Sequence, residues 1–355
     1  KYLWIKIMAY SSIAKPTDHF NTLLFTGDGS SNRGITGVGF QPDWVWLKTR
    51  TSRANSHVLI DAVRGTNRVR SDSTAAEASV SGEFISFDTD GFTLTDNASN
   101  ELNYNAVDYV TWNWKANGAG SSNNDGSTSS TVSANTTAGF SIVGWAGAGS
   151  ATTVGHGLGV VPKVVLVKNR SEVYGWQMYH ESLGNGKYVS INSTDAVATS
   201  SQSWNDTSPT SSVFSVGASD SNNKSGNNII AYCFAEKTGY SKFGSYTGNG
   251  SSDGTFVYTG FKPAFLWIKR TDTSKNWFNH DSKRLGYNPQ NEYLHSNLAV
   301  TEVASTELDM LSNGFKFLNS GSGHNGSGGT YIYLAFAENP FVGNDSGTAV
   351  PVTAR

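Results

Sequence analysis

One pattern occurs three times in this chain, and it limits the folds that the chain can adopt. In each copy an aromatic residue is followed by glycines two and four positions later, by a proline 17 positions later and, six residues further on, by a lysine. The aromatic residues are Phe25, Trp145 and Tyr246, the prolines are Pro42, Pro162 and Pro263, and the lysines are Lys48, Lys168 and Lys269. A unit of about 100 residues is too long for a solenoid repeat and has the size of a small domain. The sequence therefore predicts three tandem copies of one module.

The residue types within each copy favour strands. The chain has 38 glycines and 10 tryptophans and is 15% charged. Glycine suits tight turns, whereas aromatic and β-branched residues suit a pleated surface. Alternation after each proline places Val45, Val165 and Leu266 on one strand face and the lysines on the other. We therefore expect an all-β fold of tandem antiparallel β-sandwich modules, jelly-roll or lectin-like, with about seven short strands each. Only residues 301–311 suggest a helical turn.

The expected boundaries follow the repeat. We predict β-sandwich modules at 20–118, 137–237 and 241–342, an N-terminal extension at 1–19, a Ser/Asn/Gly linker at 119–136 and a C-terminal tail at 343–355. Residues 1–7 precede a natural start at Met8 and are expected to lie outside the fold. Because few residues separate the second and third modules, these two should touch at a fixed angle, which predicts a semi-rigid rod or arc.

Composition disfavours several classes of function. A net charge of −2 gives no broad basic field for nucleic acid. The single cysteine, Cys233, allows neither an internal disulfide nor a multi-cysteine zinc site, and its apolar surroundings predict a buried thiol. No apolar run is long enough for a membrane-spanning helix. Calcium binding by acidic loops such as residues 88–91 stays an alternative, although these loops lack the twelve-residue calcium loop. We therefore expect no cofactor and no metal.

Catalytic residues are also not evident. His57 with Asp61, His180 with Glu181, and His280 with Asp281 recur at similar places in the modules. Neighbouring residues on a strand point to opposite sides, so a strand end whose acid accepts backbone N–H groups is the preferred interpretation over a nucleophilic site. Several acids could serve glycoside cleavage, but no spacing selects a pair: Glu83, Asp88, Asp90, Glu181 and Asp281. The sequence predicts a protein that is not an enzyme.

Binding is better supported than chemistry. Trp176 and Trp277 stand 14 residues after their prolines beside polar loops, and Trp46 and Trp267 share a strand face with the lysines. Aromatic rings flanked by Asn, Asp and Ser groups are what a carbohydrate site requires. These four tryptophans are the candidate carbohydrate-binding residues, and packing in the core is the alternative.

Several longer stretches resemble a known repeat family. They are Phe40-Gln-Pro-Asp-Trp-Val-Trp-Leu-Lys48, Gly155-His-Gly-Leu-Gly-Val-Val-Pro-Lys163, Phe261-Lys-Pro-Ala-Phe-Leu-Trp-Ile-Lys-Arg270, Leu311-Ser-Asn-Gly-Phe-Lys316 and Tyr331-Ile-Tyr-Leu-Ala-Phe-Ala-Glu338. The family is of uncharacterised function, is abundant in bacteriophages, particularly marine ones, and is usually attached to virion or tail-fibre proteins. It carries no accepted catalytic residues. The second copy departs from it with Leu166 where the others have tryptophan.

The resemblance implies a non-enzymatic structural or adhesion protein of the extracellular phage particle, associated with the tail and homo-oligomeric. The implied partners are other virion proteins, copies of itself and, as a further candidate, a host cell-surface glycan, with no nucleic acid and no membrane insertion. A tail polysaccharide depolymerase and a capsid-decorating protein remain alternatives.

Overall fold

The structure is a computed structural model that describes residues 11, 13–95, 101–340, 342–345 and 348–351. Antiparallel strands dominate it, and its helical elements are short. This confirms the all-β class. We call residues 13–118 the first segment, 119–237 the second segment and 238–340 the third segment. The expected extension at residues 1–7 lies outside the described residues.

The first segment begins with a short 3-10 helix, η1 (Pro16–Asp18), and then forms two sheets. Its large sheet has the order β1 (Phe20–Thr26), β9 (Asp108–Trp114), β3 (Trp44–Thr49), β4 (Val58–Asp61), β5 (Asn67–Val69) and β6 (Ala78–Ser79). Its small sheet has the order β2 (Arg33–Thr36), β8 (Gly91–Leu94) and β7 (Phe84–Asp88).

The second segment contains a large sheet, two strand pairs and short helical turns. The sheet has the order β10 (Ser121–Asn123), β11 (Ser130–Asn135), β12 (Phe140–Ala146), β19 (Asn228–Phe234), β14 (Val164–Asn169) and β15 (Gln177–His180). The pairs are β13 (Thr152–Gly155) with β18 (Val213–Val216), and β16 (Lys187–Tyr188) with β17 (Ala198–Thr199). The turns are η2 (Glu181–Leu183), α1 (Ser201–Trp204) and α2 (Asp220–Asn223).

The structure corrects the expected linker at 119–136, because strands β10 and β11 lie within these residues. Strand β11 pairs with β12 along its whole length, and Val132 is buried in the core of this segment. The polar composition of β11 gave no hydrophobic signal for a strand, because buried positions of this strand include Ser130 and Ser133. Residues of low hydrophobicity can extend a sheet whose other strands supply the apolar surface.

The third segment forms two four-stranded sheets. The first has the order β20 (Ser241–Thr247), β27 (Thr330–Pro340), β22 (Phe261–Arg270) and β23 (Trp277–Asp281). The second has the order β21 (Phe256–Tyr258), β26 (Gly314–Phe317), β25 (Val303–Leu311) and β24 (Gln290–Tyr293). In the expected C-terminal tail, β28 (Val342–Asp345) pairs with β29 (Thr348–Pro351).

The helical turn expected at 301–311 is wrong, because these residues contain the whole of β25. That strand pairs with β24 on one side and β26 on the other. Bonding to two neighbours overrides the local preference, which is a weak guide when tertiary partners are present.

The three prolines stand at or near strand starts in the large sheets. Pro42 and Pro162 each lie two residues before their strand, β3 or β14. Pro263 lies within β22, where the register with β27 shifts on both sides of it. Proline lacks a backbone N–H, so strand starts and bulges are the positions that it can occupy without removing a ladder hydrogen bond.

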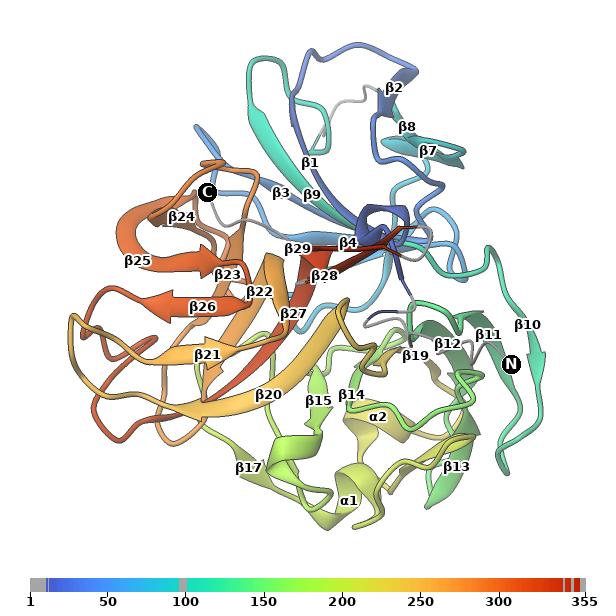
Figure 1. Cartoon of the computed structure of the whole chain (residues 1–355). Coiled ribbons are helices and arrows are strands. Elements are labelled where there is room, and N and C mark those ends of the chain that lie inside the picture. The colour runs from blue at the N-terminus through green and yellow to red at the C-terminus, as the bar shows by residue number, and fades with distance from the viewer. Residues whose placement is uncertain (1–10, 12, 96–100, 341, 346–347, 352–355) are drawn as a thin grey trace, which may run out of the picture.

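Each large sheet is covered on both faces. One face packs against the smaller strands of its own segment and buries Val45, Val165 and Leu266, as the alternation predicts. The opposite faces of all three sheets meet in one central core, and Figure 1 shows the three groups of strands arranged around it. The structure therefore corrects the expected rod or arc. The first segment contacts the third as well as the second, so the three segments surround one core.

Aromatic rings fill the central core. The Trp114 ring centroid lies 4.4 Å from that of Trp44 within the first segment, 6.5 Å from Phe234 of the second and 5.5 Å from Phe336 of the third. Buried aromatic side chains contribute the largest apolar areas and pack favourably in tilted geometries. The segments therefore share the apolar surface that would otherwise stabilise each one alone.

The glycines of the repeated pattern lie against a loop that carries a buried asparagine. A Cβ atom on Gly27, Gly147 or Gly248 would lie 2.0, 2.1 or 2.4 Å from a backbone carbonyl oxygen, so no side chain fits there. The next backbone N–H after each glycine donates to a buried asparagine at 2.8–3.2 Å: Asn103, Asn223 or Asn325. Close approach of the two backbones explains why glycine recurs at this position.

Replacing Asn223 with alanine should lower the free energy of unfolding by about 1–3 kcal/mol, because a buried polar group left without a partner costs that much. The amide of Asn223 accepts from the Ala148 N–H at 2.8 Å and donates to the carbonyls of Ser150 and Gly217 at 2.7 and 2.6 Å. Urea unfolding would measure the loss. The exposed Asn124→Ala variant is the matched control, and equal losses in the two variants would contradict this role.

Candidate functional site

The four candidate carbohydrate-binding tryptophans are buried, which corrects that prediction. Trp46, Trp176 and Trp277 are fully buried and Trp267 is 2% exposed, so no ring face can stack on a sugar. The prediction assumed that one strand face meets solvent, but the central core covers that face. Packing in the core, the alternative interpretation, describes all four.

The indole N–H groups of two of these tryptophans join neighbouring segments. Trp176 of the second segment donates to the Arg70 carbonyl of the first at 2.8 Å. Trp277 of the third segment donates to the Ser190 carbonyl of the second at 2.9 Å. His57 completes the circle, because its Nε2 lies 2.9 Å from the His295 carbonyl of the third segment. Each segment thus has at least one ring nitrogen that hydrogen-bonds a backbone carbonyl of a neighbouring segment.

The repeated lysines are all buried, and two of them bond across the same contacts. The Lys168 ammonium group donates to the carbonyls of Asn169 and Tyr174, and to Thr74 of the first segment at 3.1 Å. Lys269 donates to Lys275 and, at 2.9 Å, to Thr194 of the second segment. Lys48 bonds Thr49 within its own segment. Burial lowers the pKa of all three ammonium groups to about 8.

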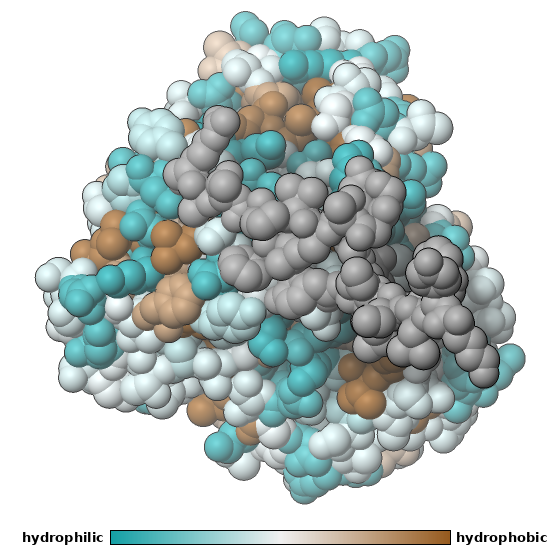
Figure 2. Space-filling model, viewed as in Figure 1, coloured by the Kyte–Doolittle hydropathy of each residue, from teal (hydrophilic) through white to brown (hydrophobic). Residues whose placement is uncertain are grey.

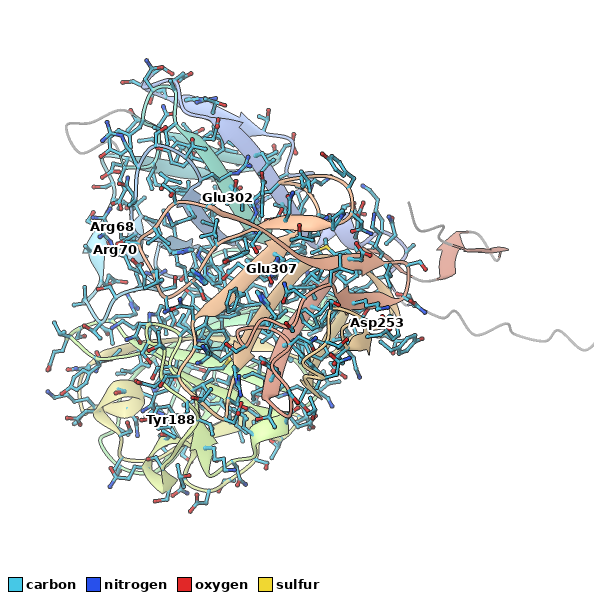
Figure 3. The ribbon with its side chains drawn as sticks, turned by 90° about the vertical axis from the view of Figure 1, so that its left-hand side faces the viewer. Arg68, Arg70, Tyr188, Asp253, Glu302 and Glu307 are labelled. Carbon is cyan, nitrogen blue, oxygen red and sulfur yellow. The ribbon has the colours of Figure 1, made fainter. Side chains whose placement is uncertain are left out.

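Part-buried ion pairs also join the segments at two of the contacts. Arg170 of the second segment forms two bonds of 2.8 Å with Glu77 of the first. Arg50 of the first segment bonds Glu302 of the third at 3.0 and 3.1 Å, and Figure 3 labels Glu302 where these two segments meet. Bidentate geometry of this kind fixes orientation as well as adding energy.

Two of the three recurring acids are strand-end caps, as the sequence predicts. The Asp61 carboxylate accepts from the backbone N–H groups of Val63 and Arg64 at 3.1 and 3.0 Å, and Asp281 accepts in the same way from Lys283 and Arg284. The prediction is wrong for Glu181 of the second segment, whose carboxylate pairs with Lys163; here the His180 ring accepts from the Ser182 N–H at 3.2 Å instead.

The acidic loop at residues 88–91 also has structural partners. Asp88 accepts from the hydroxyls of Ser86 and Thr93, each at 2.7 Å. Asp90 accepts from the backbone N–H groups of Gly37 and Gly39 at 3.0 and 2.6 Å. Across the part of the chain that the structure describes, no three His, Cys, Asp or Glu side chains are placed to hold a metal ion.

A buried chain of polar groups lies in the third segment, and sequence reasoning missed it. The Nε2 atoms of His280 and His324 are 3.0 Å apart, and His324 Nδ1 lies 3.0 Å from the Glu307 carboxylate. Burial lowers the pKa of His280 well below its usual value. All three side chains are at least nine-tenths buried, so a substrate has no access to them. Only His280 follows the repeat, which left no spacing signal for the other two.

Cys233 is fully buried, and burial raises the pKa of its thiol. This confirms the predicted structural thiol, because a reactive cysteine needs exposure and a lowered pKa. No helix among the described residues is long and apolar enough to span a membrane.

Two grooves at contacts between segments are accessible candidate sites. A groove of about 340 Å³ lies between the first and second segments, where its lining includes Val63, Thr131, Arg170 and Asn228. A groove of about 370 Å³ lies at the contact between the second and third segments, with Leu183, Ser245, Thr271 and Thr330 in its lining. Hydroxyl, amide and guanidinium groups of this kind hydrogen-bond polar ligands, so these grooves replace the tryptophans as candidate binding sites.

One comparison with known proteins gives a family. A model for a domain of unknown function, DUF7483, matches residues 15–340. The chain belongs to this family. The DUF7483 match runs from just before η1 to the last residue of β27, so one family unit contains all three large sheets. This extent agrees with a central core that the three segments share. A search of curated proteins found no match.

Proposed function

We propose that this chain is a non-enzymatic structural and adhesion protein of a bacteriophage particle, built from three copies of a β-sandwich module around a common core. The observation that carries the proposal is the circle of contacts between segments. In these contacts, ring nitrogens and ammonium groups hydrogen-bond backbone carbonyls of neighbouring segments. These groups are the kind that a catalytic site would use, but here they are committed to structural bonds. A scaffold of this kind holds surface groups in fixed positions, which suits assembly and attachment.

The three-copy arrangement is supported by corresponding strand orders. The orders β1-β9-β3-β4, β12-β19-β14-β15 and β20-β27-β22-β23 place the closing apolar run second and the strand that carries the repeated lysine third in each sheet. Buried asparagines occupy the same position relative to the repeated glycines. The phage location is supported by the resemblance of the repeated motifs, and it implies other virion proteins and copies of this chain as partners.

The ligand that we propose for the grooves is a host surface glycan. In the groove between the first and second segments, Thr131 and Asn228 are exposed, and their side chains make no hydrogen bond to any of the described residues. Figure 2 shows small, separate apolar groups among polar side chains on the visible face, so polar recognition suits this surface better than one broad apolar contact. Weak sites of this kind would gain affinity from the many copies on a particle.

The test measures binding of the full chain to host cells and to purified surface polysaccharide. The Thr131→Ala, Asn228→Ala double variant should bind about tenfold more weakly, since two hydrogen bonds are lost at about 0.5–1.5 kcal/mol each. The matched control is Asn117→Ala, Thr136→Ala, which removes the same residue types at exposed positions outside the groove. Unchanged binding by a folded groove variant would show that this groove does not recognise the glycan.

A reducing-sugar assay on the same polysaccharide separates adhesion from the alternative depolymerase activity. We expect no sugar release above background, and release would overturn the non-enzymatic proposal. Antibody labelling of intact particles would place the chain, because label at the tail supports attachment, whereas uniform label on the head supports decoration.

A further inference from the structure

The histidines of this chain are concentrated around the third segment. His280, His295 and His324 belong to it, and His57 and His180 reach its backbone from the other two segments. His57 lies 2.9 Å from the His295 carbonyl, and His180 lies 3.4 Å from the Tyr333 carbonyl. The third segment is therefore bonded to both neighbours through an imidazole nitrogen.

Hydrogen bonding fixes the protonation state of both linking rings. Nδ1 of His57 accepts from the Trp46 indole N–H at 2.9 Å, so Nε2 carries the proton and donates to His295. Nδ1 of His180 accepts from the Ser182 N–H at 3.2 Å, so Nε2 donates to Tyr333. A second proton on either ring would face a hydrogen-bond donor and would bury a charge.

The surroundings of both rings oppose that second proton. Burial, together with Lys48, His295 and Arg284, lowers the pKa of His57 well below its usual value, against the favourable bond to the His295 carbonyl. Burial lowers the pKa of His180 to about 4, helped by Lys163 and opposed by Glu181 and the Tyr333 carbonyl. The Asp72 carboxylate faces the backbone N–H of His57 at 3.1 Å, and the Trp112 ring stacks on the His57 ring with centroids 6.5 Å apart.

The contact between the first and second segments uses different chemistry. Its buried ring donor is the indole of Trp176, which does not titrate, and its other bonds include Arg170 with Glu77 and Arg64 with the Tyr232 hydroxyl. The histidine at its edge, His19, is half-buried and accepts from the Asn135 amide. Exposure already gives such a ring access to water, so protonating it requires little opening.

We propose that mild acid releases the third segment from the first two, with His57 and His180 as the groups whose protonation opens its contacts. The third segment also carries His280 and His295, whose protonation loosens it further. The first and second segments stay joined. The acid response belongs to the scaffold and does not depend on which ligand the grooves bind.

The direction of the effect follows from linkage. A buried neutral histidine contributes stability that is fully present above about pH 6.5, the value for an exposed ring, and is lost as the pH falls below it. Each ring that becomes exposed on opening raises the ratio of open to closed molecules by up to tenfold per pH unit. Glu292 and Asp72 act in the opposite direction, because burial raises the pKa of both carboxyl groups. Histidine variants are therefore needed to measure how much of the pH dependence of opening comes from the histidines.

The experiment is hydrogen exchange of the full chain between pH 7 and pH 5, with exposure times scaled for the intrinsic chemistry of exchange. We expect β22, β23 and β27 to exchange at least tenfold faster at pH 5, whereas residues 70–77 and β14, at the contact of the first two segments, change much less. Equal acceleration in all segments, or none, would overturn the proposal.

The variant His57→Gln, His180→Gln keeps an amide that can donate to each carbonyl and removes both titrating rings. Its acid acceleration should fall at least tenfold. His156→Gln is the matched control, because this buried ring bonds the Thr210 carbonyl within the second segment at 3.1 Å. If the double variant does not fold, each single variant supplies the same comparison, with a smaller expected reduction. Acid acceleration that persists unchanged in the folded glutamine variants would contradict the assignment to these two histidines.

Discussion

Replacing Trp114 with alanine should lower the free energy of unfolding by about 3–5 kcal/mol, the range for removing a large buried aromatic side chain. The ring is 1% exposed and contacts aromatic rings from all three segments. Because one cavity then opens in a core that every segment shares, we expect a single unfolding transition that shifts as a whole. Chemical denaturation followed by fluorescence and circular dichroism would measure it.

Trp114→Phe is the matched control for this prediction. The Trp114 indole N–H is buried and has no hydrogen-bond partner among the residues that the structure describes, so phenylalanine removes an unsatisfied donor while keeping an aromatic ring. Its loss should be clearly smaller than that of the alanine variant. Two separate transitions, with only the first segment destabilised in the alanine variant, would show that the segments fold independently and that the central core does not couple them.

Much of the fold follows from local sequence, because strand content depends on neighbouring residues. The strands after the prolines, the turns at the repeated glycines and the burial of Val45 and Leu266 are all visible in residue type and alternation. The closed arrangement was not predicted. It depends on the second buried face of strands such as β3, where all six residues are buried. Residues 44–47 of β3 are all apolar, and an unbroken apolar run of this kind indicates a sheet covered on both faces.

The site was harder to predict, because its residues gain their role from other segments. Trp176 and Trp277 look like surface aromatics beside polar loops, yet their partners are carbonyls of Arg70 and Ser190, about a hundred positions earlier. Nothing in a single module shows that contact. The acids at Asp61 and Asp281 were predicted correctly as strand-end caps, because a cap bonds backbone groups within three residues.

Replacing Asp61 with alanine should cost about 3–5 kcal/mol of unfolding free energy, the loss expected when one partner of a buried ion pair is removed. The Asp61 and Arg64 side chains are fully buried and 2.5 Å apart. The same carboxylate accepts from the Tyr232 hydroxyl of the second segment at 2.7 Å. Alanine therefore leaves the guanidinium in the interior with Glu77, at 3.3 Å, as its remaining acid. Denaturant unfolding of the purified variant measures the loss.

Two comparisons separate a lost partner from a general loss of charge. Asp18→Ala removes an exposed pair with Lys15 and should cost less than about 1 kcal/mol. In the double variant Asp61→Leu, Arg64→Met the unpaired charge is also removed, so part of the loss should return, because apolar groups of similar size can replace a buried pair. If the double variant is less stable than Asp61→Ala, the stabilising role lies in the bonds that Arg64 makes to Leu59 and Tyr232. In that case the guanidinium, rather than the ion pair, joins the first segment to the second.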